Sequence, residues 1–318
     1  MAVQHGTATR LAADLWLLDT LFQGEPGVIA SYLLTGPAGL ALVDVGSAAT
    51  VEQLLAGVRA AGFAPEDIQH LVLTHIHLDH AGAAGELVRR MPAARVYVHS
   101  IGAPHLVDPS KLLVSAERIY GANMKMLWGD ILPVPEDHIV IISDGEELRV
   151  GSRTLRVLYT PGHAIHHVAF YDAAHSAVFA GDVAGVRLIG SAFVRPPTPP
   201  PDLNLEDWSA SIERLAALQP EVLYLPHFGP ADAVPAHFEQ LRARLYDWGN
   251  LMLADIRAGK SDEQLALDLA RHSDPEVARE AGTNGDVDVK RYELATNYLM
   301  SAQGYVRYYR KNHPELLA

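Results

Sequence analysis

The chain has 318 residues, enough for one large domain or for one domain with an appendage. Its 38 acidic and 25 basic residues give a net charge of −13, and no basic stripe stands out, so we expect no nucleic-acid partner. Because the chain has no cysteine, disulfides and thiol chemistry are excluded for it.

Targeting and membrane segments are also not expected. Residues 1–6 lack the charged start and apolar core of a secretory signal. No apolar run approaches the roughly 20 residues that cross a bilayer. We therefore expect a cytoplasmic protein without a membrane partner, and the lack of cysteine agrees with a reducing compartment.

The first part of the chain predicts alternating strands and helices. Three apolar segments, 15–18, 31–34 and 41–44, are typical of strands and are separated by turn signals. A helix is expected over 50–61, with Thr50 as its N-cap, because apolar residues recur there at helical spacing and a glycine follows.

The most informative segment is 75–80. It follows an apolar strand-like run, 70–74, and precedes a helix-forming run, 81–90. It therefore lies at the carboxyl end of a strand, where open α/β folds place their chemistry. Four of its six residues carry imidazole or carboxylate groups, the ligands that zinc and similar metals prefer: His75, His77, Asp79 and His80.

Three later strand-like segments each end close to another candidate ligand. The segments 155–160, 177–180 and 222–225 are followed by His163, Asp182 and His227 respectively. Taken singly, His and Asp are ordinary loop and turn residues. Together with the cluster at 75–80 they predict a metal site assembled from four strand ends.

The segment 104–136 departs from the alternation and predicts one or two inserted helices. Tyr120 and Trp128 within it are candidate substrate-wall residues, with packing at the domain edge as the alternative. A second candidate wall is the proline-rich stretch 195–201, whose alternative is a surface connector.

The C-terminal part predicts helices only. We expect them over 236–258, over 262–272 with Ser261 as N-cap, and over 288–310. The expected domains are a catalytic domain over 1–232 and a helical cap over 233–318. The cap would either limit access to the site or form a homodimer surface.

The chain resembles the metallo-β-lactamase-fold hydrolase superfamily, in its glyoxalase II or lactonase-like branch. The family's motifs occur in order, at 42–46, 74–82, 161–163, 181–182 and 226–227. The resemblance implies an α/β fold, an αββα sandwich of the metallo-β-lactamase type, here with a C-terminal all-helical extension.

The resemblance also implies two divalent metal ions, zinc first, with manganese or iron as alternatives. One metal would be held by His75, His77 and His163, and the other by Asp79, His80 and His227, with Asp182 bridging them. Two further residues would support the ligands from behind. One is Asp44, which would orient the ligand loop, with an ordinary strand-end turn residue as the alternative. The other is one of His166 and His167, with the choice between them left open; the alternative is that one of these histidines faces solvent and the other packs below the site.

Two details favour hydrolysis within this superfamily. Asp182 stands where antibiotic-degrading members often have cysteine, and His77 stands where a glutamate would suggest the oxygen-reducing di-iron branch. We expect a metal-bridging hydroxide to attack a small or medium ester, lactone or thioester, with Asp79 orienting the nucleophile and accepting its proton.

Three alternatives stay open. A phosphodiesterase could use the same nucleophile on phosphorus. A mononuclear-iron persulfide dioxygenase-like oxidoreductase would need only the ligands equivalent to His75, His163 and Asp182. A regulatory or binding protein could retain the metal site and act through its helical cap.

Overall fold

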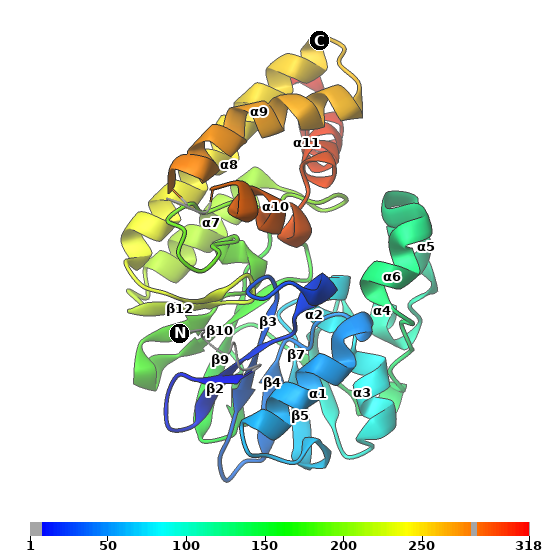
Figure 1. The fold of residues 1–318 in the computed structure, drawn as a ribbon, viewed down its shortest axis with the longest axis vertical. Coiled ribbons are helices and arrows are strands. Elements are labelled where there is room, and N and C mark those ends of the chain that lie inside the picture. Colours follow the sequence, from blue (N-terminus) through cyan, green and yellow to red (C-terminus); the bar gives the residue numbers. More distant parts are fainter. Residues whose placement is uncertain (1–7, 281–284, 318) are drawn as a thin grey trace. The chain divides into compact units, whose positions relative to one another are not determined.

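The computed structural model describes residues 8–280 and 285–317. These residues fall into two units (Figure 1). Unit 1 comprises Met1–Tyr159 and His166–Ala180, and unit 2 comprises Thr160–Ile165 and Gly181–Ala318. Residues 1–6, where no secretory signal is expected, lie outside the described residues. The boundary expected after residue 232 stays a prediction.

The first sheet of unit 1 contains, in its described part, seven strands in chain order. The pairs from β1 to β4 are antiparallel and those from β4 to β7 are parallel. The strands expected near 15–18, 31–34, 41–44 and 70–74 are confirmed. The strands are β1 (Ala8–Arg10), β2 (Leu15–Asp19), β3 (Ala30–Leu34), β4 (Leu40–Val43), β5 (Ile68–Val72), β6 (Arg95–His99) and β7 (Ile139–Ile142).

Helices cover one face of this sheet (Figure 1). They are α1 (Val51–Ala60), α2 (Leu78–Ala81), α3 (Ala84–Arg90) and α4 (Ala103–Val107). Leu54 and Leu87 from the helices join Val96 from β6 in one buried apolar core, which makes helix formation and sheet packing depend on each other.

The helix expected over 50–61 is confirmed as α1, but the expected cap is wrong in its chemistry. Thr50 occupies the N-cap position without a capping bond from its side chain, and its hydroxyl instead donates to the Ser47 carbonyl at 3.1 Å. Ser47 accepts from the backbone N–H of Ala49, because a short 3-10 turn precedes α1 and takes its own cap.

The second sheet of unit 1 is antiparallel and packs on the first. Its strands are β8 (Glu147–Val150), β9 (Arg153–Tyr159), β10 (Val168–Asp172) and β11 (Ala177–Phe179). The Tyr32 ring of β3 meets the Phe179 ring of β11 edge to face, with centroids 5.5 Å apart. Unit 1 thus contains a helix layer and two sheet layers.

The inserted segment expected over 104–136 carries α5 (Ser110–Tyr120) and α6 (Met124–Trp128) after α4. Trp128 of α6 is buried and stacks on Phe22, with ring centroids 5.4 Å apart. This contact ties the end of the insertion to the turn between β2 and β3.

A buried arginine joins two carboxylates within unit 1. Arg153 binds both oxygens of Asp14, at 2.7 and 2.9 Å, and donates to Asp172 at 2.9 Å. The hydrogen bond from Arg153, stronger than the opposing effect of burial, holds the pKa of the Asp14 carboxyl well below its usual range.

We expect this contact to make folding sensitive to acid. A carboxyl whose pKa is depressed on folding contributes stability above its unfolded pKa of about 3.9, and that stability is lost as the pH falls through the folded pKa. Chemical unfolding between about pH 5 and pH 2 should therefore show a smaller loss of stability in Asp14→Asn than in the parent. The exposed Asp67→Asn variant is the control, and a parent-like pH profile for Asp14→Asn would contradict the expectation.

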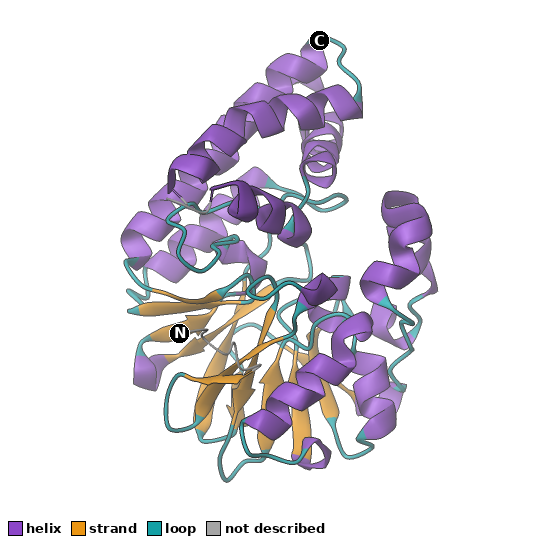
Figure 2. Ribbon diagram, viewed as in Figure 1, coloured by secondary structure: helices purple, strands orange, loops and turns teal. Residues whose placement is uncertain are grey.

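Unit 2 contains α7 (Leu205–Ala216), a hairpin of β12 (Val222–Leu225) and β13 (Gly229–Ala231), and a C-terminal helical region. That region consists of α8 (Val234–Arg257), α9 (Asp262–Glu280), α10 (Gly285–Ala295) and α11 (Tyr298–Asn312), with only helices among its described elements after β13 (Figure 2). None of the helices in the described ranges combines the length and apolarity needed to cross a membrane.

Two of the expected C-terminal helices have wrong bounds. The helix expected over 288–310 is two helices, because the side chain of Asn297 accepts from the backbone N–H of Met300 at 2.8 Å and starts α11 afresh. The helix expected to end at residue 272 continues to Glu280 as α9, with Pro275 inside it. The expected cap at Ser261 is confirmed by its reciprocal bonds with Gln264.

Candidate metal centre

The loop after β5 and the short helix α2 gather four candidate ligands within unit 1: His75 and His77 lie in the loop, and Asp79 and His80 lie in α2. His75 and His80 are buried, and their ring centroids lie 4.0 Å apart. The Nε2 atom of His75 lies 3.0 Å from Nδ1 of His77, and Nε2 of His80 lies 3.5 Å from Oδ2 of Asp79. β5 ends just before the segment 75–80, and α2 begins within it. The ligand atoms of His75 and His77 lie within 4.8 Å of each other, and so do those of Asp79 and His80.

Asp44, at the end of β4, fixes this loop. Its carboxylate accepts from the backbone N–H of Thr74 at 2.8 Å, from the Thr74 hydroxyl at 2.8 Å, and faces Nδ1 of His80 at 3.0 Å. When Nδ1 of His80 carries the proton, Nε2 is left as the metal-binding nitrogen. The structure thus places Asp44 where its expected orienting role requires it.

Asp44→Asn should weaken metal binding without unfolding unit 1, because asparagine keeps the shape of the side chain and tolerates the positive φ of 53° at this position. The amide has only one oxygen, so it cannot accept the hydrogen bonds that the two carboxylate oxygens of Asp44 accept from Thr74 and His80. We expect metal affinity to fall about 10- to 100-fold, measured by competition with a chelator. The exposed Asp67→Asn variant should bind like the parent, and parent-like affinity in Asp44→Asn would refute the assigned role.

His166 and His167 both lie beside the ligand loop. The ring of His166 is nearly parallel to that of His75 at a centroid distance of 6.1 Å, and the ring of His167 lies 5.1 Å from that of His75. Both are buried, and the backbone N–H of Val168 donates to the Thr74 carbonyl at 2.8 Å. Neither histidine is the solvent-facing residue that the sequence left as an alternative.

A second group of candidate ligands forms within unit 2. His163, Asp182 and His227 are all buried and come from three separate loops. Nε2 of His163 lies 3.4 Å from Oδ2 of Asp182, and Nε2 of His227 lies 3.6 Å from Oδ1 of the same carboxylate. Each oxygen of Asp182 therefore faces a different imidazole, which is the arrangement that a bridging carboxylate needs.

His163 is positioned by contacts that its motif does not reveal. Its Nδ1 lies 2.8 Å from the carbonyl oxygen of Pro197, so a proton on Nδ1 would leave Nε2 for a metal. The ring meets Trp208 of α7 edge to face at 5.5 Å. Gly162 has a φ of 133°, and a Cβ there would collide with the backbone of Trp208, so only glycine fits.

The loop that carries Asp182 is held from two helices. Nε1 of Trp208 in α7 donates to the Val183 carbonyl at 2.8 Å, and Nε2 of His237 in α8 lies 2.7 Å from the Ala184 carbonyl. Burial lowers the pKa of His237 to about 4, so its ring is neutral at neutral pH. Trp208 and His237 carry no motif, and the sequence did not indicate them. Pro197 belongs to the stretch 195–201, which was expected as a substrate wall or a connector and not as a support of His163.

The two candidate wall residues of the insertion differ in their surroundings. Burial, and then the neighbouring Asp79 carboxylate, raise the pKa of the Tyr120 hydroxyl well above its usual range. Tyr120 is thus protonated at neutral pH, and it lies close enough to Asp79 for the charge of that carboxylate to affect its pKa. Trp128 packs behind it, with ring centroids 5.0 Å apart, between Tyr120 and Phe22.

The donor set of each unit suits the expected metals. Imidazole and carboxylate bind zinc, manganese and iron, and the carboxylate and hydroxyl contacts behind the imidazoles are the support that such ligands have in metal sites. Unit 1 provides His75, His77, Asp79 and His80, and unit 2 provides His163, Asp182 and His227.

Comparison with known proteins agrees with this reading. The sequence pattern of the Metallo-beta-lactamase superfamily matches residues 24–227. A crystal structure of the metallo-beta-lactamase family protein TTHA1429 from Thermus thermophilus is similar with a TM-score of 0.69 and 26% identity, over 95% of each chain. The expected fold class, with its C-terminal helical extension, is confirmed.

Curated relatives are similar at low identity. The metallo-beta-lactamase fold-containing protein ST1585 of Sulfurisphaera tokodaii is 29% identical over 64% of this chain and 74% of its own length. An atrochrysone carboxyl ACP thioesterase of Aspergillus fumigatus is 28% identical over 70% of this chain and 61% of its own. A hydroxyacylglutathione hydrolase of Aeromonas hydrophila is 27% identical over 58% and 56%. With residues 24–227 matching its pattern, the chain belongs to the metallo-beta-lactamase superfamily and is a metal-dependent hydrolase of that fold.

Proposed function

We propose that the chain is a dinuclear metallohydrolase whose substrate is a small or medium thioester. The observation that carries the proposal is the gathering of imidazole and carboxylate groups in each unit, within the part of the chain that matches the superfamily: His75, His77, Asp79 and His80 in unit 1, and His163, Asp182 and His227 in unit 2. Relatives named as thioesterases and as a hydroxyacylglutathione hydrolase favour a thioester over the ester or lactone.

In this proposal the two groups hold one pair of metals. His75, His77 and His163 would hold one ion, and Asp79, His80 and His227 would hold the other; zinc is the first choice of metal, with manganese or iron as alternatives. Asp182 would bind both ions, and the orientation of its two oxygens toward His163 and His227 supports that role. Bound there, two divalent ions would supply an activated water near neutral pH and polarise the substrate carbonyl.

The residues of the chain then have separate tasks. Asp79 orients the attacking water and accepts its proton, while Asp44 holds His80 in the tautomer that binds through Nε2. The Tyr120 hydroxyl, kept protonated, can donate a hydrogen bond to the substrate.

A thioester suits a site of this kind. The attack forms the new carbon–oxygen bond, and collapse of the intermediate breaks the carbon–sulfur bond. A thiol has a pKa of about 8.5 and leaves as a thiolate far more readily than an alcohol leaves as an alkoxide. The reaction therefore does not need a strong general acid, and the sequence offers no separate residue for that role.

A hydrolysis screen on protein of known metal content tests the proposal. We expect S-acyl-pantetheine to be hydrolysed at least about 100-fold more efficiently, in kcat/KM, than bis-nitrophenyl phosphate, with nitrophenyl esters and a lactone panel between them. The Asp79→Ala variant should lose this activity. Preference for the phosphodiester, or oxygen uptake with a persulfide substrate, would overturn the proposal in favour of the corresponding alternative.

A further inference from the structure

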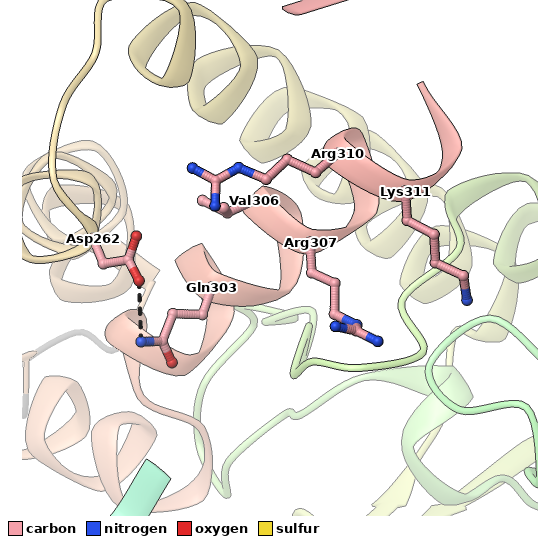
Figure 3. A pocket seen from close by; sticks show the side chains of 6 residues that line it. All are labelled: Asp262, Gln303, Val306, Arg307, Arg310 and Lys311. Carbon is pink, nitrogen blue, oxygen red and sulfur yellow. Dashed lines mark hydrogen bonds between the residues drawn. The ribbon is translucent and has the colours of Figure 1, made fainter. Parts of the chain in front are cut away.

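The end of α11 carries three cations that line a cavity in unit 2. The cavity has a volume of about 300 Å³, at the lower end of the range for small-molecule sites. Figure 3 shows its lining, with the head groups of Arg307 and Lys311 directed to the same side of the helix. The lining residues are Asp262, Gln303, Val306, Arg307, Arg310 and Lys311.

The protein does not neutralise the positive charge of this cavity. In the parts of the chain that the structure describes, Arg307, Arg310 and Lys311 form no ion pair with a carboxylate, and all three are exposed. The one acid of the lining, Asp262, accepts a hydrogen bond from Gln303 at 3.2 Å. Three clustered cations contrast with the net charge of −13 for the whole chain.

Compensation of the helix dipole explains only part of the cluster. Cations are favoured in the last turn of a helix, and Arg310 and Lys311 lie in the last turn of α11. Arg307 lies a turn earlier. Its Nε donates to the carbonyl of Pro201 at 3.0 Å, which anchors the guanidinium at the cavity.

The same proline-rich stretch connects the cavity to His163, a proposed metal ligand. Pro201 accepts from Arg307, and Pro197, four residues earlier, faces His163 with its carbonyl at 2.8 Å. Four residues span at most about 14 Å, so Nε of Arg307 lies within roughly 20 Å of the His163 ring. The extended pantetheine arm of a thioester carrier covers a distance of this order.

We propose that the basic cavity binds the phosphate groups of the substrate's thioester carrier. Guanidinium groups bind phosphate with paired hydrogen bonds, and a lysine adds a point charge, so this lining selects a phosphorylated carrier of the coenzyme A class. The inference rests on the proposed thioester hydrolysis and adds the carrier's chemistry to it. A phosphopantetheine arm borne by a carrier protein would present the same phosphate chemistry.

Binding of free coenzyme A tests the cavity without turnover. Calorimetry should show that Arg307→Gln/Arg310→Gln weakens binding about tenfold or more, and that added salt weakens binding to the parent. The control Arg59→Gln/Arg149→Gln removes the same charge from two exposed positions in unit 1 and should bind like the parent. Equal binding by all three proteins, or none by the parent, would overturn the inference.

Hydrolysis separates this inference from the proposed function. The double variant should raise KM for acetyl-coenzyme A by a larger factor than KM for S-acetyl-pantetheine, which lacks the phosphates. Equal factors would overturn the phosphate site while the thioesterase proposal stands. Loss of coenzyme A binding in the variant, with neither thioester hydrolysed by the parent, would support the site and refute the thioesterase.

Two further ligands identify the source of the phosphate. Free 4′-phosphopantetheine that binds as tightly as coenzyme A would support a protein-borne arm, and a clear preference for coenzyme A would support the nucleotide. If S-acyl-glutathione, which offers carboxylates, were the substrate whose KM depends on Arg307 and Arg310, the phosphate assignment would be wrong.

Discussion

Asp182→Ala is expected to lower thioester hydrolysis about a thousandfold or more and to reduce the metal content of the purified protein. Asp182 faces His163 with one oxygen and His227 with the other, so alanine removes the group that both imidazoles share. Loss of bound metal removes several kcal/mol of transition-state stabilisation, which corresponds to a rate factor of about this size.

The matched control is Asp232→Ala, an exposed carboxylate in the same unit, five residues beyond His227. It should retain both metal and activity. Circular dichroism and thermal unfolding establish that each variant is folded. An Asp182→Ala protein with parent-like metal content and activity would show that the carboxylate does not bridge the site.

Gly304→Ala is expected to damage the site from a distance. Gly304 lies in α11, and a Cβ there would collide with the carbonyl oxygen and carbon of Thr198, so the proline-rich stretch must move. Thr198 neighbours Pro197, whose carbonyl holds His163. Overpacking of this kind costs about 3 kcal/mol, and the shifted carbonyl should also lower metal affinity.

Urea unfolding and chelator competition measure the two effects separately. The control is Asn312→Ala, a half-buried position at the end of the same helix, which touches neither the stretch nor the site by any described contact and should change both quantities little. Parent-like stability and metal affinity in Gly304→Ala would show that α11 does not position the loop that carries His163.

The features that could be predicted from the sequence are determined by short, local stretches of the chain. Short apolar segments predict strands because sheet side chains are buried. Functional residues of open α/β folds lie at the carboxyl ends of strands, so His and Asp residues just after such segments are candidate ligands. The position of the segment 75–80 after β5 is therefore as expected, although its residues 78–80 already belong to helix α2 and not to a loop. The order of the family's motifs led us to expect His163, Asp182 and His227 close together, and they do lie close together within unit 2. Their roles as ligands stay predictions.

The parts that it did not predict depend on long-range packing. Thr198 contacts Ser301 across 103 residues of sequence, and no local pattern indicates which helix will cover the proline-rich stretch. The buried Arg195 has its guanidinium 3.7 Å from the centroid of the Tyr298 ring, a contact equally invisible in either segment alone. The break before α11 was missed because one asparagine cap outweighed a continuous apolar spacing.

Counting the metals bound to the purified chain tests the central claim most directly. Protein loaded with zinc, manganese or iron in turn and freed of excess ion should carry two metals per chain by elemental analysis, and His163→Ala, Asp182→Ala and His227→Ala in unit 2 should lower that number as His75→Ala and His80→Ala do in unit 1. Variants of unit 2 that leave the metal content unchanged, a single bound iron, or a chain that binds none of the three metals would contradict a shared dinuclear centre.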